Sequence, residues 1–349
     1  MRHPPLQPGW IDAPHRSAAL GRFELESGEQ IDDLHVSYVV HGDDDHDARH
    51  TRGARTKPVI LGLCAIGSTH HRLDFLIGAA RAFDPARFTV LVIDALGNGL
   101  SSSPSNSATQ AGRRFPRFTI RDMVRSQKRL LEHLRIDTLH AVVGASMGGM
   151  QALQWGVSYP GMMSHIVALT PMAKTAPWAQ AINHAGRLAL ANAPLDSDGA
   201  PDWSAWVTVM HVLAMRTPQR FAQDLAQDAA QPPGVTDWLA RRTQWWRAQQ
   251  CDPLDWTYQS WAYDAHDVGH TPGFAGDTAR ALASITARTL IGVPRIDLYN
   301  PVEDGIWAAQ QIPGRTLLQL PFDSGHLMAS EADAAAAQQL NDALGRFVA

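Results

Sequence analysis

The residue types and segments that this chain lacks exclude several classes of protein. Its 349 residues include only two cysteines, Cys64 and Cys251, so the disulfide framework of a small secreted protein is excluded. No apolar run approaches the ~20 residues that a membrane helix needs, and the first ten residues contain prolines but no apolar signal segment. Excess positive charge is missing too, since 30 Lys and Arg face 34 Asp and Glu. We therefore expect a cytoplasmic protein that binds neither nucleic acid nor membrane.

The hydrophobic pattern predicts an α/β fold. Short apolar segments of strand length alternate with segments of helical spacing, which is typical of a mainly parallel sheet with helices on both faces. The first 30 residues are expected to form an irregular arm. Strands are expected at residues 34–40, 59–63, 88–94, 140–143, 166–169, 289–293 and 316–320, and helices at 119–134, 151–159 and 331–347.

The alternation stops after Thr170. From there to about Ala283 the chain has helical segments broken by prolines, and eight of the eleven tryptophans fall in this part. We therefore predict a helical cap, residues 171–283, inserted into an α/β core made of residues 1–170 and 284–349. Ligands of open α/β sheets bind at the carboxyl ends of the strands, so a cap placed there would cover the pocket.

The most informative stretch is Val142–Met150, with the sequence VVGASMGGM. It combines an apolar strand, a Gly-x-Ser-x-Gly pattern and the start of a helix. A serine hydroxyl is a poor nucleophile unless it is exposed, oriented and close to a base. A sharp strand-to-helix turn exposes Ser146 and aims the backbone N–H of Met147 at a developing oxyanion. The pattern favours a nucleophile at Ser146 over an ordinary glycine-rich turn.

A serine nucleophile needs a base and an acid that orients it, and α/β-hydrolases place them in the chain order Ser, Asp or Glu, His. Asp297 follows an apolar strand and begins a turn. Asp304 is a competitor, but it lies where the next helix is expected to begin, so we favour Asp297. His326 lies on a short glycine-containing loop after the last expected strand. Among 16 histidines it alone combines this place with the right chain order.

A second oxyanion donor is expected from the loop after the strand at 59–63. The backbone N–H of Ala65 or of Ile66 is the candidate. Cys64 lies on the same loop. Since no base is matched to it, we expect a small buried residue that lines the pocket rather than a second nucleophile.

Other polar groups carry weaker signals. The loop Gly42–Lys57 is rich in Asp and His, but its hydrophilic surroundings favour a solvated loop over a metal site. His266, Asp267 and His270 suggest a metal or a second dyad, and we favour a structural or pocket-lining role. Arg187 either binds a substrate carboxylate or lies on the surface, and both interpretations stay open. We expect no metal and no cofactor.

Three segments carry a family resemblance: Phe118–Val124 (FTIRDMV), Val143–Trp155 (VGASMGGMQALQW) and Tyr159-Pro160. With them the chain resembles the homoserine O-acetyltransferase family of α/β-hydrolases along nearly its whole length. The resemblance implies a hydrolase core with a helical cap and a triad of Ser146, Asp297 and His326. Family members often form homodimers through this cap, so a homodimer is one expectation for this chain.

Departures from the family pattern are informative. The family's acetyltransferases typically carry an acidic residue directly after the catalytic histidine, which helps hold the amino group of the acceptor. Here that residue is Leu327, and an ammonium group without its partner in a partly dry pocket costs about 1–3 kcal/mol. The segments Asp94–Asn106 and Trp261–Gly269 resemble a side branch of the family that includes esterases acting on short-chain acyl esters.

Three functions remain in view. The first is hydrolysis of a small carboxylic ester, or another small acyl donor, through an acyl-enzyme. The alternative is O-acetyl transfer from acetyl-CoA to homoserine, serine or a similar hydroxyl, the one case in which acetyl-CoA is a co-substrate. The third is a catalytically silent binding protein, against which the intact set of Ser146, Asp297 and His326 argues.

Overall fold

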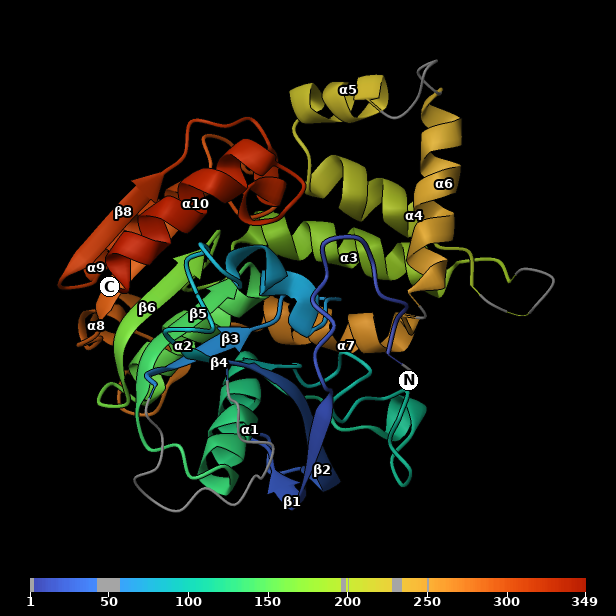
Figure 1. Cartoon of the computed structure of the whole chain (residues 1–349). Helices are drawn as coiled ribbons and strands as arrows, with labels where there is room; N and C mark the ends of the chain where they lie inside the picture. Colours follow the sequence, from blue (N-terminus) through green and yellow to red (C-terminus); the bar gives the residue numbers. More distant parts are fainter. Residues whose placement is uncertain (1–2, 43–56, 196–198, 200, 228–233, 250) are drawn as a thin grey trace.

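A computed structural model describes residues 3–42, 57–195, 199, 201–227, 234–249 and 251–349. In this part of the chain eight strands form one sheet in the order β1-β2-β4-β3-β5-β6-β7-β8 (Figure 1). The strands are β1 (Arg16–Glu24), β2 (Gln30–His41), β3 (Val59–Leu63), β4 (Thr89–Ile93), β5 (Leu139–Ala145), β6 (Met163–Leu169), β7 (Arg288–Val293) and β8 (Arg315–Gln319). Strands β3 to β8 are parallel to one another, whereas β2 runs antiparallel to both β4 and the edge strand β1. The predicted fold class is confirmed.

The expectation of an irregular arm over the first 30 residues is wrong for β1. Its buried side chains, Ala18, Leu20 and Phe23, do not alternate regularly. The pairing of β1 with β2 shifts register around Gly21, whose φ is +68°. Such a bulge adds one residue to a strand and breaks the two-residue period by which strands are predicted. The hydrophobic pattern therefore concealed this strand.

Helices cover the sheet on both sides. They include α1 (Ile120–His133), α2 (Met147–Ser158), α8 (Thr278–Ala283), α9 (Val302–Gln311) and α10 (Ala334–Phe347). A capping box between Thr119 and Asp122 begins α1, as expected for Thr at the N-cap. Helix α2 is buried from Met147 to Val157 and packs on β5 and β6. Because α2 is held on the sheet, the turn that precedes it is fixed in place.

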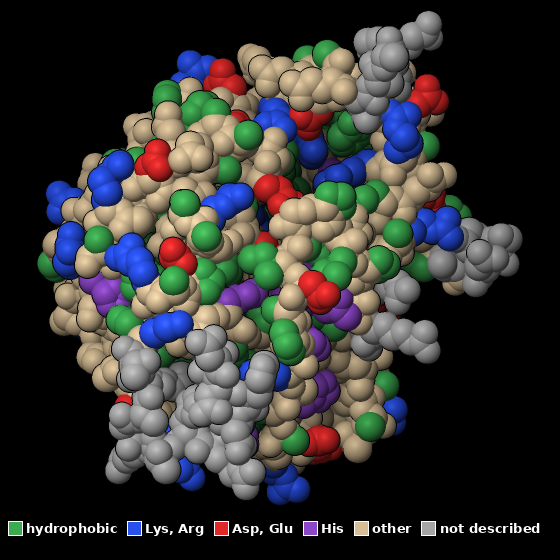
Figure 2. All heavy atoms as spheres, viewed as in Figure 1, with side chains coloured by type: hydrophobic (Ala, Val, Ile, Leu, Met, Phe, Trp, Pro, Cys, Tyr) green, Lys and Arg blue, Asp and Glu red, His purple; other side chains and the backbone are tan. Residues whose placement is uncertain are grey.

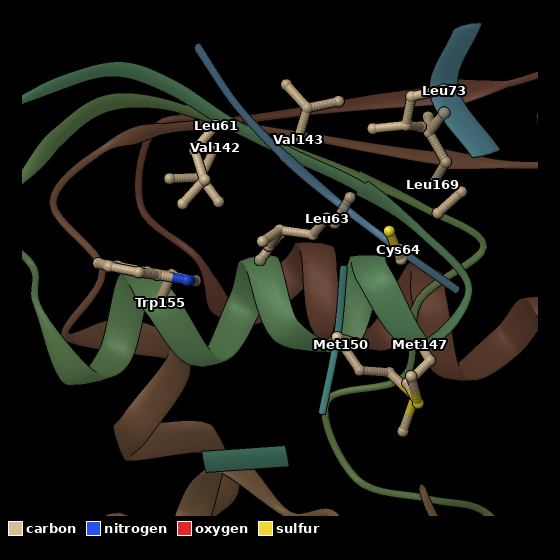
Figure 3. Close-up of a cluster of buried hydrophobic side chains, with 14 of the residues drawn as sticks. Leu61, Leu63, Cys64, Leu73, Val142, Val143, Met147, Met150, Trp155 and Leu169 are labelled. Atoms are coloured by element: carbon tan, nitrogen blue, oxygen red, sulfur yellow. The ribbon is translucent and has the colours of Figure 1, made fainter. Parts of the chain in front are cut away.

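Side chains from β3, β5 and α2 meet in one part of the core. Figure 3 shows Leu61, Leu63 and Val142 on the side of the strands that faces α2, from which Trp155 projects, and Val143 on the opposite side. All five are fully buried. The indole N–H of Trp155 also donates to Gln127 Oε1 on α1 (2.8 Å). This packing ties both helices to the strands that lead into the site.

A helical segment separates β6 from β7, although these strands are neighbours in the sheet. It contains α3 (Pro177–Ala191), α4 (Ser204–Val207), a π-helical turn (Thr208–Ala214), α5 (Pro218–Gln227), α6 (Val235–Ala248) and α7 (Pro253–Asp264), and α3 to α6 gather on one side in Figure 1. Helix α8 packs on α2 and α9 instead. The element order agrees with an inserted cap, while its predicted limits, 171–283, stay a prediction.

The described residues also form short 3-10 helices: η1 (His70–Leu76), η2 (Gly112–Arg114), η4 (Val268–His270) and η5 (Gly325–Ala329).

Lys, Arg, Asp and Glu side chains are interspersed on the face shown in Figure 2. Among the described residues, no helix has both the length and the apolar character that a membrane crossing requires.

Candidate active site

Ser146 forms the turn between β5 and α2. Its backbone has φ +57° and ψ −123°, a conformation that costs a residue with a side chain about 1–3 kcal/mol. The turn is held in place because the Ser146 N–H donates to Leu169 O at the end of β6 (2.9 Å). Ser146 thus occupies the sharp strand-to-helix turn that the sequence pattern predicted.

Two glycines around Ser146 are required by close packing. A Cβ on Gly144 would lie 2.1 Å from Gly148 O, and a Cβ on Gly148 would lie 2.4 Å from Leu63 O. Real Cβ atoms do not approach backbone oxygens so closely. The Gly-x-Ser-x-Gly pattern therefore lets α2 begin directly against β3 and β5.

Ser146, His326 and Asp297 form one hydrogen-bonded relay. His326 Nε2 lies 2.8 Å from Ser146 Oγ, and His326 Nδ1 lies 2.8 Å from Asp297 Oδ2. The other oxygen of Asp297 accepts the N–H groups of Tyr299 (2.8 Å) and Asn300 (3.0 Å). All three relay residues are buried and follow the carboxyl ends of parallel strands β5, β7 and β8. The geometry is that of a nucleophile, a base and an orienting acid.

The competing acid lies elsewhere. Asp304 is in the first turn of α9, as its sequence context indicated. Of the two candidate carboxylates, Asp297 is the one hydrogen-bonded to His326.

Two tyrosines beside the relay were not predicted. The ring of Tyr299 is edge-on to His326 (5.1 Å between centroids) and stacks on Tyr263 (5.5 Å). The Tyr263 hydroxyl donates to Asn300 Oδ1 (2.5 Å). Burial raises the pKa of Tyr263, while hydrogen bonds with Ser146 and Asn300 oppose that rise. Burial also raises the pKa of Tyr299, so both phenols stay protonated, and the Tyr263 hydroxyl adds a polar group near Ser146. The place of Tyr299, two residues after the acid, was the one available signal.

The predicted oxyanion donors lie around the nucleophile. Met147 is the first residue of α2, and the first N–H groups of a helix have no acceptor within it. Ala65 and Ile66 line the same cavity as Ser146. Gln151 of α2 donates to Cys64 O (3.0 Å), which fixes this loop against the helix. Both backbone groups, Ala65 N–H and Ile66 N–H, remain candidates.

Cys64 is fully buried, as predicted, but it is not among the residues that line the cavity. Its thiol faces Ile93 O on β4 (3.0 Å) instead. Burial raises the pKa of this thiol well above its ordinary value. A thiol that resists ionisation is a poor nucleophile, so Cys64 has a packing role.

A cavity of about 470 Å³ opens beside the relay and is lined by Ser146 and His326. Leu327, which is 6% exposed, forms part of its wall. Four tryptophans of the helical segment between β6 and β7 also line it: Trp206, Trp245, Trp246 and Trp256. The cavity thus has four tryptophans on the side of this helical segment and an apolar residue, Leu327, next to His326.

Residues 60–333 match the family described as alpha/beta hydrolase fold. The chain belongs to the α/β-hydrolase family.

Relatives of this α/β-hydrolase include both esterases and transferases. A homoserine O-acetyltransferase from Methanobrevibacter ruminantium is 32% identical over 194 residues, and the match spans 51% of this chain but only 38% of that protein. A probable esterase from Corynebacterium glutamicum is 25% identical over 347 residues, 91% of this chain and 90% of the other. The crystal structure of an acetylester hydrolase from Corynebacterium glutamicum is similar with a TM-score of 0.85 and 25% identity, covering 96% of both chains.

Arg187 does not line the cavity of this α/β-hydrolase. Its guanidinium pairs with Asp264 (2.7 Å) and donates to Ser260 (3.0 Å). An arginine already paired in this way gives no support to the interpretation that it binds a substrate carboxylate.

The group around His266 also lies away from the cavity. Asp267 accepts the Gly269 N–H and the Thr278 hydroxyl, and burial lowers the pKa of His266 to about 4. His270 is exposed. These contacts fit the structural role, whereas the pocket-lining role is wrong. The Asp- and His-rich stretch 43–56 lies outside the described residues, so its predicted solvation stays a prediction.

Proposed function

We propose that this α/β-hydrolase is a serine esterase that hydrolyses small carboxylic esters of the acetyl type. Ser146 acts as nucleophile, His326 as general base and then general acid, and Asp297 as the residue that orients His326. The observation that carries the proposal is the unbroken relay of two 2.8 Å contacts from Ser146 Oγ through His326 to Asp297.

The reaction follows from the positions of the protons. His326 Nε2 accepts the Ser146 proton while Oγ attacks the ester carbonyl carbon, and the resulting oxyanion is held by the N–H of Met147 with that of Ala65 or Ile66. Return of the proton from His326 to the alkoxy oxygen releases the alcohol and leaves an acyl-enzyme. Water then attacks, gives its proton to His326, and the carboxylic acid leaves as Ser146 is reprotonated.

Two observations favour water over a bound amino alcohol as the acyl acceptor. Leu327 gives the cavity wall no charge where the family's transferases carry one. Moreover, the sequence match to the Corynebacterium probable esterase covers 91% of this chain, whereas the sequence match to the Methanobrevibacter transferase covers 51% of it. An acceptor with an ammonium group would therefore be held weakly near His326.

O-acetyl transfer from acetyl-CoA to homoserine, serine or a similar hydroxyl remains the second candidate. A specific observation favours it, since Asp252 and Asp255 line the cavity and a carboxylate can hold an ammonium group. Burial, however, raises the pKa of Asp255 to about 7, which leaves much of it neutral at neutral pH. Acetyl-CoA would be needed in this case alone, and the esterase needs no cofactor.

One assay with two arms separates the candidates. The first arm follows p-nitrophenyl acetate hydrolysis without an acceptor, and the second follows CoA release from acetyl-CoA with and without L-homoserine or L-serine. We expect ester hydrolysis that Ser146→Ala abolishes, and no acceptor-dependent CoA release. Acceptor-dependent CoA release would identify a transferase. If a fluorophosphonate did not label Ser146, the third candidate, a silent binding protein, would be favoured.

The other expectations accompany this proposal. The partner is a small ester, without nucleic acid or membrane, and the location is cytoplasmic. A homodimer through the helical segment between β6 and β7 is checked by light scattering of the purified protein.

A further inference from the structure

Three histidines meet beside the cavity, away from the catalytic relay. His70 and His71 begin η1, directly after the loop that carries Ala65 and Ile66, and His3 comes from the N-terminal segment. His3 Nε2 lies 3.3 Å from His70 Nε2 and 3.1 Å from His71 Nε2. One nitrogen from each ring lies within 4.8 Å of the other two.

Carboxylates fix which ring nitrogens face inward. His70 Nδ1 contacts Asp94 Oδ2 (3.0 Å), and His71 Nδ1 contacts Asp74 Oδ2 (2.6 Å). When each Nδ1–H is donated to a carboxylate, each Nε2 has a lone pair and no proton. Metal-binding histidines almost always have this second contact, which sets the tautomer and the direction of the ring.

The proton count leaves one contact unsatisfied. In its neutral form His3 Nε2 carries at most one hydrogen, so it can bond to only one of His70 Nε2 and His71 Nε2. The other close N···N contact then joins two lone pairs. A cation among the three nitrogens would use every lone pair.

The charged groups around the three histidines also favour a bound cation. The side chains of Asp74 and Asp94 are 1% and 0% exposed, and their ion-pair partners among the described residues are histidines. Asp74 Oδ1 is buried with no hydrogen-bond partner in the described part of the chain. Two buried carboxylates, one of them with an oxygen that lacks a hydrogen-bond partner, favour a cation in this group.

We propose that His3, His70 and His71 bind a divalent transition-metal ion of the zinc class, with Asp94 and Asp74 orienting two of the imidazoles. Zinc–nitrogen bonds of about 2.0–2.1 Å in tetrahedral geometry place two ligand nitrogens roughly 3.3 Å apart, close to the separations found here. Three neutral imidazoles suit zinc, cobalt, nickel or copper and do not suit magnesium or calcium.

The site has a route of entry and a structural consequence. His71 and Trp10 both line the cavity, and the Trp10 ring stacks on His71 (4.1 Å between centroids, 11° between planes). A bound ion would join the N-terminal segment to η1, which lies beside it (Figure 1), and so fix the loop that carries Ala65 and Ile66. The sequence argument overlooked this group because His3 and His70 are 67 positions apart.

The test uses the full-length chain without a histidine tag, freed of metal by a chelator and titrated with Co²⁺. We expect one Co²⁺ per chain with the visible absorption of a four-coordinate ion, and displacement by Zn²⁺. Asp74→Asn is expected to weaken Co²⁺ binding about 10–100-fold, because Asp74 orients a ligand. His3→Ala removes a ligand itself, from a segment outside the sheet, so we expect a larger loss of Co²⁺ affinity. His133→Ala, at the exposed end of α1, is the matched control and should bind as the wild type does.

Two results would overturn the proposal. One is wild-type protein that binds less than one Co²⁺ per chain or binds it without four-coordinate absorption. The other is a folded His3→Ala protein, verified by circular dichroism, that binds as tightly as His133→Ala. If the variants do not fold, anomalous diffraction from zinc-loaded wild-type crystals decides. A peak bonded to the three Nε2 atoms supports the site, and a peak elsewhere or none refutes it.

Discussion

The ring of Tyr299 lies edge-on against the imidazole of His326, with centroids 5.1 Å apart and planes at 67°. The backbone N–H of the same tyrosine donates to Asp297 Oδ1 (2.8 Å). Tyr299 thus contacts both His326 and Asp297. The Tyr299 hydroxyl points the other way and contacts Asn183 Oδ1 on α3. Tyr299 therefore connects the relay to the helical segment between β6 and β7.

The ring and the hydroxyl of Tyr299 can be separated by mutation. Tyr299→Phe keeps the ring against His326, so we expect kcat to fall no more than a few-fold. Tyr299→Ala removes the ring that limits His326 rotation, and we expect a fall in kcat on the order of tenfold or more, because misplacing a catalytic group slows the chemical step. Steady-state hydrolysis of p-nitrophenyl acetate measures both. Equal losses in the two variants would show that the hydroxyl, not the ring, matters.

Gly148→Ala is expected to destabilise the fold, because its Cβ would lie 2.4 Å from Leu63 O and would push α2 away from β3. The expected loss in unfolding free energy is about 1–3 kcal/mol, typical of overpacking. Gly161→Ala is the matched control, since a Cβ at Gly161 meets no atom within 4 Å. Urea unfolding of both variants measures the difference. Equal stability of the two would contradict the close approach.

Asp255 is expected to make stability depend on pH. Burial raises its pKa to about 7, while hydrogen bonds from Ser105 lower it and Asp252 raises it further. Between the unfolded value near 4 and about 7, the folded state holds a proton that the unfolded state has lost. Stability from this group is therefore greatest at low pH and falls as pH rises through that window.

Asp255→Asn removes this charge and keeps the shape. We expect it to stabilise the protein at pH 8 by about 4 kcal/mol relative to the wild type, with little difference at pH 4, where the folded state holds the proton and the unfolded state is about half protonated. Urea unfolding at the two pH values measures the difference between variant and wild type. If Asp255→Asn stabilised the protein equally at both pH values, the pKa of Asp255 would not be raised in the folded state.

Leu327→Asp tests how the wall beside His326 selects the acyl acceptor. A carboxylate there would be poorly solvated unless an ammonium group paired with it, so we expect lower ester hydrolysis and higher acceptor-dependent CoA release with L-homoserine. Leu327→Asn, of similar size and without charge, is the control. Should Leu327→Asp and Leu327→Asn give the same ratio of transfer to hydrolysis, the charge of this wall would not select the acceptor.

The sequence was informative where the signal is local. Apolar runs such as Val59–Leu63 and the Gly-x-Ser-x-Gly turn each lie within a few residues, and chain order then indicated Asp297 and His326. β1 escaped notice because the bulge at Gly21 breaks its alternation.

Contacts between distant segments were beyond the sequence pattern. Tyr263 and Tyr299 are 36 positions apart and stack beside His326. His3 and His70 are 67 positions apart and are also in contact. Arg187 was ambiguous for the same reason, since its partner Asp264 belongs to another helix. Side-chain periodicity gives the face of each element, but not which faces meet.

The most direct test of the account is to trap the acyl-enzyme. The protein is mixed rapidly with p-nitrophenyl acetate, quenched in acid and digested, and the peptides are analysed by mass spectrometry. The account predicts an acetyl group on Ser146 that accumulates with the first turnover and is absent from Ser146→Ala, which should also lose hydrolysis. Full hydrolysis by Ser146→Ala, or acetylation at another residue with Ser146 unmodified, would contradict it.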